Sequence, residues 1–231
     1  MFILVTGPTR SGKSEWAEEV TLRLFQQLLN QKNNPQNHPE SNPQNELPIP
    51  VQPVMRQSLN APPINPPTIE LPLPTIELIY IATASHNPDD PEWTARIKAH
   101  QQRRLSPWQT LEVPEHLCQA LNELTADQVV LVDALGTWLA NLLDRDDQQW
   151  QILETALINA VVNCRATLVC VAEEVGWSVV PAYTSGRLFR DRLGRLVRQL
   201  AGVADHTYLV VAGFALDLRQ MGTRVPDAFA K

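Results

Sequence analysis

A glycine-rich segment near the N-terminus constrains the fold of this chain more than any other feature. It lies between an apolar run at residues 2–6 and a helical pattern at residues 13–29, and it reads Gly7-Pro8-Thr9-Arg10-Ser11-Gly12-Lys13-Ser14. A Gly-x-x-x-x-Gly-Lys-Ser segment between a strand and a helix is typical of a P-loop, in which backbone N–H groups and the helix dipole bind phosphate oxygens. We expect Lys13 to contact the β- and γ-phosphates of a nucleotide and the Ser14 hydroxyl to ligate Mg²⁺. The alternative is a glycine-containing turn that binds no anion.

Strand and helix patterns alternate along most of the chain. Strands are predicted at residues 2–6, 77–83, 109–113, 129–133, 168–172 and 207–212, and helices at 13–29, 92–102, 115–125, 138–143, 149–163 and 186–201. Near-continuous apolar strands separated by helices indicate a parallel sheet that helices cover on both faces. The predicted fold is therefore an α/β domain of the P-loop NTPase type, with a mostly parallel sheet and helices on both faces.

Residues 31–77 depart from this pattern. They contain 12 of the 19 prolines and no glycine. Because proline removes a backbone donor and disfavours a helical conformation in the residue before it, we expect neither a helix nor a central strand here. The chain is thus predicted to form a single domain over residues 1–231, interrupted at 31–77 by a Pro/Asn/Gln-rich, disordered insertion. A docking segment for a proline-binding module is the alternative.

The overall charge and the cysteines argue against several classes of function. The formal net charge is −6, which disfavours nucleic acid as the main partner because a phosphate backbone needs a basic surface. The three cysteines, Cys118, Cys164 and Cys170, show no metal-binding spacing and are typical of thiols in a reducing compartment. No apolar run approaches the roughly 18 residues of a membrane span. We therefore expect a cytoplasmic protein with no membrane span and no nucleic-acid partner.

The carboxyl ends of parallel strands meet at one edge of a sheet, and ligands bind there. This rule brings the P-loop together with Asp133 and with the turn Ala82-Thr83-Ala84. Asp133 ends an apolar strand, and its carboxylate is expected beside Mg²⁺ or the water shell of the ion. Capping of the next segment is the alternative role for this residue. Glu173 and Glu174 also follow a strand, and they could bind substrate groups or act as a general base, unless they are solvated loop acids.

One histidine lies among arginines in and just after the predicted helix at 92–102. Arg96, His100, Arg103 and Arg104 are spaced by three and four residues, so they share one helix face. A neutral imidazole can attack phosphorus, and neighbouring arginines can neutralise phosphate charge. The alternative is a surface histidine at the end of a basic helix, with no catalytic role.

A series of blocks in order along the chain carries a shared pattern. The blocks are Arg10-Ser11-Gly12-Lys13-Ser14, Tyr80-Ile81-Ala82-Thr83-Ala84, the spaced residues Arg96, His100, Arg104, Trp108, Thr110 and Glu112, then Glu174-Val175-Gly176, and finally Phe189-Arg190-Asp191 with Gly194-Arg195. Together they resemble the bifunctional adenosylcobinamide kinase / adenosylcobinamide-phosphate guanylyltransferase family of cobalamin biosynthesis. The resemblance covers the chain outside residues 31–77. Pro8 and Glu173 depart from it, since the family usually has glycine and commonly asparagine at these positions.

The resemblance implies two reactions. In the first, ATP or GTP phosphorylates a hydroxyl of adenosylcobinamide; in the second, GMP passes from GTP to that phosphate, which releases pyrophosphate and gives adenosylcobinamide-GDP. It further implies that His100 carries the guanylyl group covalently and that the protein forms a homotrimer. The nucleotide contacts that it implies are Gly7, Pro8, Thr9, Arg10, Ser11, Gly12, Lys13, Ser14, Ala82, Thr83, Ala84, Gln101, Gln102, Arg103, Arg104, Glu112 and Asp133.

The predicted site thus has Lys13 and His100 as catalytic residues, Ser14 and Asp133 as Mg²⁺ ligands, and GTP and ATP as co-substrates. Two other functions stay open on the sequence alone. One is a P-loop small-molecule kinase that lacks guanylyltransferase activity, with His100 inert. The other is a non-catalytic, nucleotide-dependent interaction module that binds a partner through the proline-rich segment.

Overall fold

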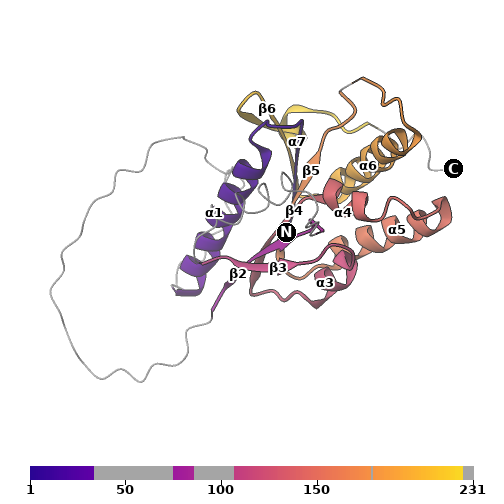
Figure 1. The fold of residues 1–231 in the computed structure, drawn as a ribbon. Coiled ribbons are helices and arrows are strands. Elements are labelled where there is room, and N and C mark those ends of the chain that lie inside the picture. The colour runs from indigo at the N-terminus through magenta and orange to yellow at the C-terminus, as the bar shows by residue number, and fades with distance from the viewer. Residues whose placement is uncertain (34–74, 86–106, 178, 226–231) are drawn as a thin grey trace, which may run out of the picture.

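The computed structural model of the chain describes residues 1–33, 75–85, 107–177 and 179–225 (Figure 1). Within them a seven-stranded sheet has the order β3-β2-β4-β5-β1-β6-β7. The strands are β1 Phe2–Gly7, β2 Glu77–Ala82, β3 Gln109–Glu112, β4 Gln128–Asp133, β5 Thr167–Glu173, β6 His206–Val211 and β7 Phe214–Asp217. The helices are α1 Lys13–Asn33, α3 Leu117–Glu123, α4 Leu135–Asn141, α5 Asp147–Asn163, α6 Thr184–Val203 and α7 Leu218–Met221. Every neighbouring pair is parallel except β6 and β7.

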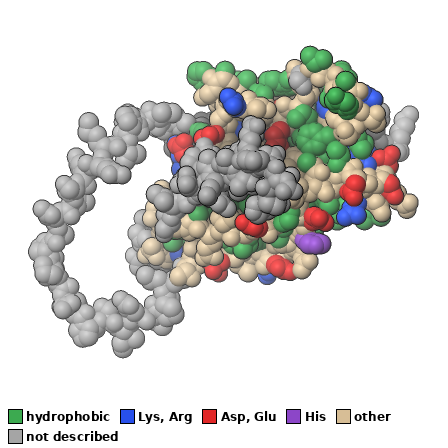
Figure 2. Space-filling model, in the orientation of Figure 1, with side chains coloured by type: hydrophobic (Ala, Val, Ile, Leu, Met, Phe, Trp, Pro, Cys, Tyr) green, Lys and Arg blue, Asp and Glu red, His purple; other side chains and the backbone are tan. Residues whose placement is uncertain are grey.

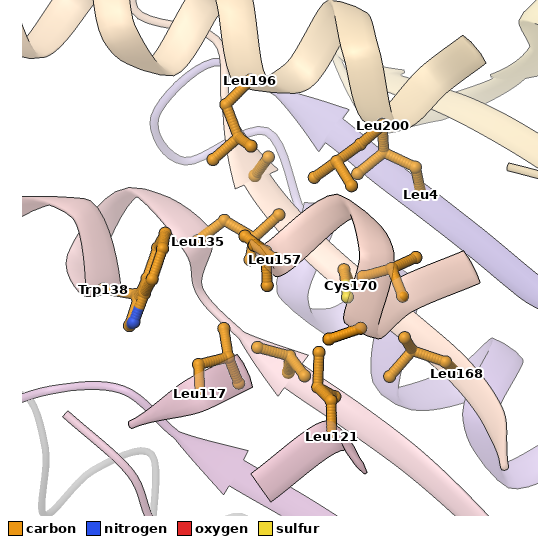
Figure 3. Packing of buried hydrophobic residues seen from close by; sticks show 14 of the residues in the cluster. Leu4, Leu117, Leu121, Leu135, Trp138, Leu157, Leu168, Cys170, Leu196 and Leu200 are labelled. Atoms are coloured by element: carbon orange, nitrogen blue, oxygen red, sulfur yellow. The ribbon is translucent and has the colours of Figure 1, made fainter. Parts of the chain in front are cut away.

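Successive residues of the central strands point to opposite faces of the sheet, so each strand contributes to two cores. Leu4 and Cys170 belong to the core beneath α3, α4, α5 and α6, part of which Figure 3 shows. Ile3 and Val171 belong to the core beneath α1, on the other face of the sheet (Figure 1). The predicted α/β fold, with a mostly parallel sheet and helices on both faces, is confirmed.

Helix α1 packs on the sheet through one stripe. Its buried residues are Ala17, Val20, Thr21 and Leu24, at the spacing of three and four residues that places side chains on one helix face. The helix continues through Gln31–Asn33, so the expectation that residues 31–77 hold no helix is wrong at its start. The first proline is Pro35, and the helical conformation that proline disfavours in the residue before it concerns Asn34, beyond the end of α1. At the other end of this segment, the strand predicted from residue 77 is confirmed, because β2 begins at Glu77.

The sequence analysis missed the C-terminal hairpin and the short helix α7. The hairpin turn is formed by Ala212 and Gly213, both with positive φ, and it directs β7 back along β6. All four residues of the edge strand β3 are exposed, unlike the apolar strands that the prediction assumed. The predicted helix at 92–102 lies outside the described residues.

The described surface mixes charges, and hydrophobic side chains gather where β5 leads into α6 (Figure 2). The exposed apolar residues of that connection are Trp177, Val179, Val180 and Tyr183. Among the helices of the described segments, none has the length and apolar character needed to cross a membrane.

Candidate nucleotide-binding site

The P-loop segment joins the end of β1 to the start of α1, as the sequence predicted. Arg10 and Gly12 have φ values of 57° and 90°, so the chain turns sharply through the left-handed region at both residues. Gly7 allows a close approach, because a Cβ there would lie 2.2 Å from the Val210 carbonyl oxygen. Lys13 Nζ donates to the Pro8 carbonyl oxygen at 3.3 Å, which places the ammonium group across the loop.

Ser11 is the buried residue of the loop. Its hydroxyl is enclosed and has no hydrogen-bond partner within the part of the chain that the structure describes. A buried hydroxyl without a partner is costly, so such a group is expected to bind something that the free protein does not contain. Next to a loop of this shape, a phosphate oxygen is a suitable acceptor.

Asp133 receives hydrogen bonds from two other elements. Ser14 Oγ, in the first turn of α1, donates to Asp133 Oδ1 at 3.3 Å. Tyr80, on β2, donates its hydroxyl to Asp133 Oδ2 at 2.9 Å. The two predicted metal ligands, Ser14 and Asp133, therefore lie side by side, and the buried Tyr80 holds the Asp133 carboxylate through its other oxygen. The sequence analysis missed the role of Tyr80.

Thr83 joins β2 to the start of α4. Its hydroxyl donates to the Ala134 carbonyl oxygen at 2.7 Å and accepts from the Ala134 N–H at 3.0 Å. Asn141 Nδ2 donates to the Thr83 carbonyl oxygen at 2.8 Å. Since Thr83 is fully buried with these groups engaged, its side chain holds the two strand ends together.

The two glutamates at the end of β5 are both anchored. Glu174 Oε1 accepts from the Thr6 hydroxyl at 3.0 Å, and Glu173 Oε2 accepts from the Gly136 N–H at 3.0 Å. Burial raises the pKa of Glu173, while the positive charge of Lys13 acts in the opposite direction. Neither glutamate is therefore a free, solvated loop acid.

The remaining predicted site residues fall into two groups. Ala82 pairs with Asp133 on one side and with Glu112 on the other, so both carboxylates follow the same edge of the sheet. Glu112 is exposed at the end of β3. The predicted residues that lie outside the described part of the chain are His100, Gln101, Gln102, Arg103 and Arg104.

Comparison with known proteins identifies the family. The model of the family described as cobinamide kinase / cobinamide phosphate guanyltransferase matches residues 74–218. The chain belongs to this family. Membership confirms the predicted family and the predicted class of enzyme, a kinase and nucleotidyltransferase. The matched residues include β2, β4 and β5 of the site but not the P-loop itself. The geometry of the P-loop therefore supports a nucleotide site independently of the family match.

Curated relatives agree with this family. The bifunctional adenosylcobalamin biosynthesis protein CobU of Escherichia coli K12 is 35% identical over 158 residues, which cover 62% of this chain and 86% of that protein. CobU of Salmonella typhimurium LT2 is 34% identical over the same shares of the two chains. The bifunctional protein CobP of Pseudomonas aeruginosa PAO1 is 36% identical over 142 residues, covering 61% of this chain and 81% of that protein.

Proposed function

We propose that the protein phosphorylates adenosylcobinamide with ATP or GTP and then transfers GMP from GTP to the product, giving adenosylcobinamide-GDP and pyrophosphate. The observation that carries the proposal is the pairing of Ser14 with Asp133 beside the P-loop, in a chain of this family. The predicted nucleotide contacts, from residues 7–14 to Asp133, belong to the proposal.

For the kinase step, Lys13 and the loop N–H groups bind the phosphates and align the γ-phosphorus with the acceptor hydroxyl. Ser14 and Asp133 fit a Mg²⁺ site, because Mg²⁺ prefers oxygen donors and is held by one or two protein ligands together with substrate phosphates. When bound, Mg²⁺ supplies charge neutralisation at the β- and γ-phosphates.

For the second step we propose His100 as the nucleophile. Its imidazole attacks the α-phosphorus of GTP, the bond to the pyrophosphate leaving group breaks, and a guanylyl-histidine forms. A phosphate oxygen of the phosphorylated corrinoid then attacks the same phosphorus and releases the histidine. Arg103, Arg104 and their neighbours neutralise the phosphate charge in this proposal, which rests on sequence spacing. We further propose a cytoplasmic homotrimer.

Labelling tests the guanylyltransferase step, and a separate assay of adenosylcobinamide phosphorylation tests the kinase step. Incubation with GTP carrying ³²P at the α-phosphate is expected to give an acid-labile, base-stable label on the wild type and none on His100→Ala. The matched control is His116→Ala, since His116 is exposed and its side chain makes no capping hydrogen bond. Equal labelling of His100→Ala, or an unlabelled wild type, contradicts the guanylyltransferase step. Phosphorylation of adenosylcobinamide without any label identifies a kinase alone.

A further inference from the structure

A cavity of about 620 Å³ lies away from the P-loop, toward the opposite edge of the sheet. Its walls come from the last turns of α6, from the start of β6 and from residues 218–225. Thr207 of β6 pairs with Leu4 of β1, three residues before Gly7, at which the P-loop begins. Because β1 and β6 are parallel and the nucleotide site follows the carboxyl end of β1, this cavity is separate from that site.

The lining of this cavity is basic. It includes Arg198, Arg219 and Arg224, and no Asp or Glu among the residues that the structure describes. Arg219 Nη2 donates to the carbonyl oxygens of Ala201 and Gly202, both at 3.2 Å, at the end of α6. A Cβ at Gly202 would lie 2.8 Å from Arg224 Nη2. Two guanidinium groups therefore lie against Gly202, where their charge exceeds the partial negative charge of a helix C-terminus.

These arginines need not be unpaired to bind a ligand. A guanidinium carries five N–H donors in a fixed plane, so it can keep one contact and donate to another group. Arg219 uses one of its terminal nitrogens for the two carbonyl oxygens of α6 and retains its other donors. The contacts with α6 therefore hold the Arg219 guanidinium in position for a second partner.

One buried hydroxyl of the lining has no partner. Thr207 is 4% exposed, and its Oγ1 makes no hydrogen bond within the part of the chain that the structure describes. A buried hydroxyl without a partner is costly, so a group that the free protein lacks is a suitable one. A change of χ1 between staggered rotamers can turn this hydroxyl toward a ligand in the cavity.

The rest of the lining indicates the class of ligand. Ala201, Leu218 and Val225 are apolar, and Leu218 and Val225 are 38% and 69% exposed. A volume of this size is typical of sites for small organic molecules. Guanidinium groups pair with carboxylate and with phosphate, but a phosphate monoester carries about −1.5 to −2 charges near neutral pH and a carboxylate carries one. Three arginines beside an apolar wall therefore favour an organic phosphate.

We propose that this cavity binds a small phosphate monoester with an apolar body. Arg219 and Arg224 pair with the phosphate oxygens, Arg198 adds positive charge, and the Thr207 hydroxyl donates to the ligand. The apolar body covers the exposed apolar side chains of the lining. The family match ends at residue 218, so Arg219 and Arg224 lie outside the shared part of the chain. The site does not rest on the proposed reactions, and binding alone tests it.

Calorimetric titration of the full chain with phenyl phosphate tests the proposal. The titrations use the wild type and Lys13→Ala, in which binding at the P-loop no longer obscures the cavity. Lys13→Ala should retain a site for phenyl phosphate. Adding Arg224→Met should weaken that site about 10- to 100-fold, the range for a lost hydrogen bond to a charged group. Arg165→Met, which removes the same charge at an exposed position just after α5, is the control and should leave binding unchanged.

Thr207→Val separates a ligand-binding hydroxyl from a structural one. The variant keeps the shape of the side chain and removes the hydroxyl. Because this hydroxyl has no partner in the free protein, the unfolding free energy without ligand should not fall. The affinity for phenyl phosphate should fall about tenfold, at the low end of the same range. Lower stability without ligand, together with unchanged affinity, overturns the proposal.

Other results also overturn it. Unchanged affinity of Arg224→Met does so, as does binding by the wild type that disappears in Lys13→Ala, because the P-loop is then the site. Equal affinity for inorganic phosphate, which has no apolar body, refutes the class of ligand. Binding only after removal of residues 226–231 assigns the cavity to the end of the chain. A wild type that binds no phenyl phosphate but changes its oligomeric state with Arg224→Met assigns the cavity to a second copy.

Discussion

Removal of the Tyr80 hydroxyl tests whether the carboxylate of Asp133 is positioned for a cation. Tyr80→Phe deletes one donor to Asp133 Oδ2 and leaves the ring, which packs edge-on against Trp108 at 6.2 Å. The other donor to the carboxylate, Ser14 Oγ, stays at the longer distance of 3.3 Å. Asp133 is thereby freed to rotate away from Ser14.

The size of the effect follows from the geometry. A hydrogen bond to a charged group contributes about 1.5–3 kcal/mol to stability. Tyr80 is only 3% exposed, but Asp133 is half-buried and water can replace part of the lost bond, so we expect the lower end, about 1.5 kcal/mol of unfolding free energy. About 1.4 kcal/mol corresponds to a tenfold change in an equilibrium constant. Loss of a group that orients a metal ligand weakens binding by about 10- to 100-fold, so the apparent Mg²⁺ affinity in the kinase assay should fall about tenfold.

The assay is a Mg²⁺ titration of kinase activity at saturating nucleotide, together with urea unfolding. Tyr208→Phe is the matched control, because Tyr208 is 4% exposed and lies on β6, away from Asp133. Its ring packs against Trp16 of α1. It should leave the Mg²⁺ dependence unchanged. If Tyr80→Phe also leaves the Mg²⁺ dependence unchanged, or if both variants shift it equally, then Asp133 is not a Tyr80-oriented metal ligand.

Three further predictions concern the loop and the core. Lys13→Ala should lower kinase kcat by about 10²-fold or more while nucleotide-free unfolding by urea stays the same, because the bond from Lys13 Nζ to the Pro8 carbonyl oxygen is long, at 3.3 Å. Burial raises the pKa of Cys170, so as pH rises the thiol ionises in the unfolded chain before it ionises in the folded protein. The contribution of Cys170 to stability is therefore full below about pH 8.5 and is lost as pH rises. Cys170→Ala should make this loss smaller, as measured by urea unfolding at about pH 8 and about pH 10.5. Arg195→Met leaves the Glu154 side chain, which is 5% exposed, without its guanidinium partner. Since Arg195 is itself 48% exposed, we expect the free energy of unfolding to fall by about 2–3 kcal/mol, at or below the low end of the range for breaking a buried ion pair. The double variant with Glu154→Leu should recover most of this stability in urea unfolding.

Local chemistry made most of the fold predictable. The apolar runs at 2–6, 129–133 and 168–172 became β1, β4 and β5 with boundary shifts of one residue, because a strand buried on both faces has few alternatives. The hairpin strand β7 was missed since a strand of only four residues is too short for its pattern to stand out from a loop. Helix α1 extends to Asn33, beyond the predicted end at residue 29, because the first proline is Pro35 and the residues before it can continue the helix.

The site was predictable only where one motif carries the chemistry. Lys13 and Ser14 come from a contiguous pattern, and Asp133 from an acid at the end of an apolar strand. The bond from Tyr80 to Asp133 joins residues 53 positions apart, and it depends on how β2 pairs with β4. The contact of Gly136 with Glu173 likewise requires the first turn of α4 to lie over the end of β5. Local sequence holds no signal for either.

Strand β5 lies between the strand that leads into the P-loop and the strand that ends in Asp133, so the end of β5 also borders the site. If β1 and β4 were neighbours, the phosphate cradle and the metal-side carboxylate would meet directly, and the acceptor would have to approach from outside the sheet edge. With β5 between them, its terminal residue Glu173 lies at the same edge of the sheet, where the Gly136 N–H donates to its carboxylate. We therefore expect the P-loop to hold the nucleotide and the end of β5 to lie near the second reactant.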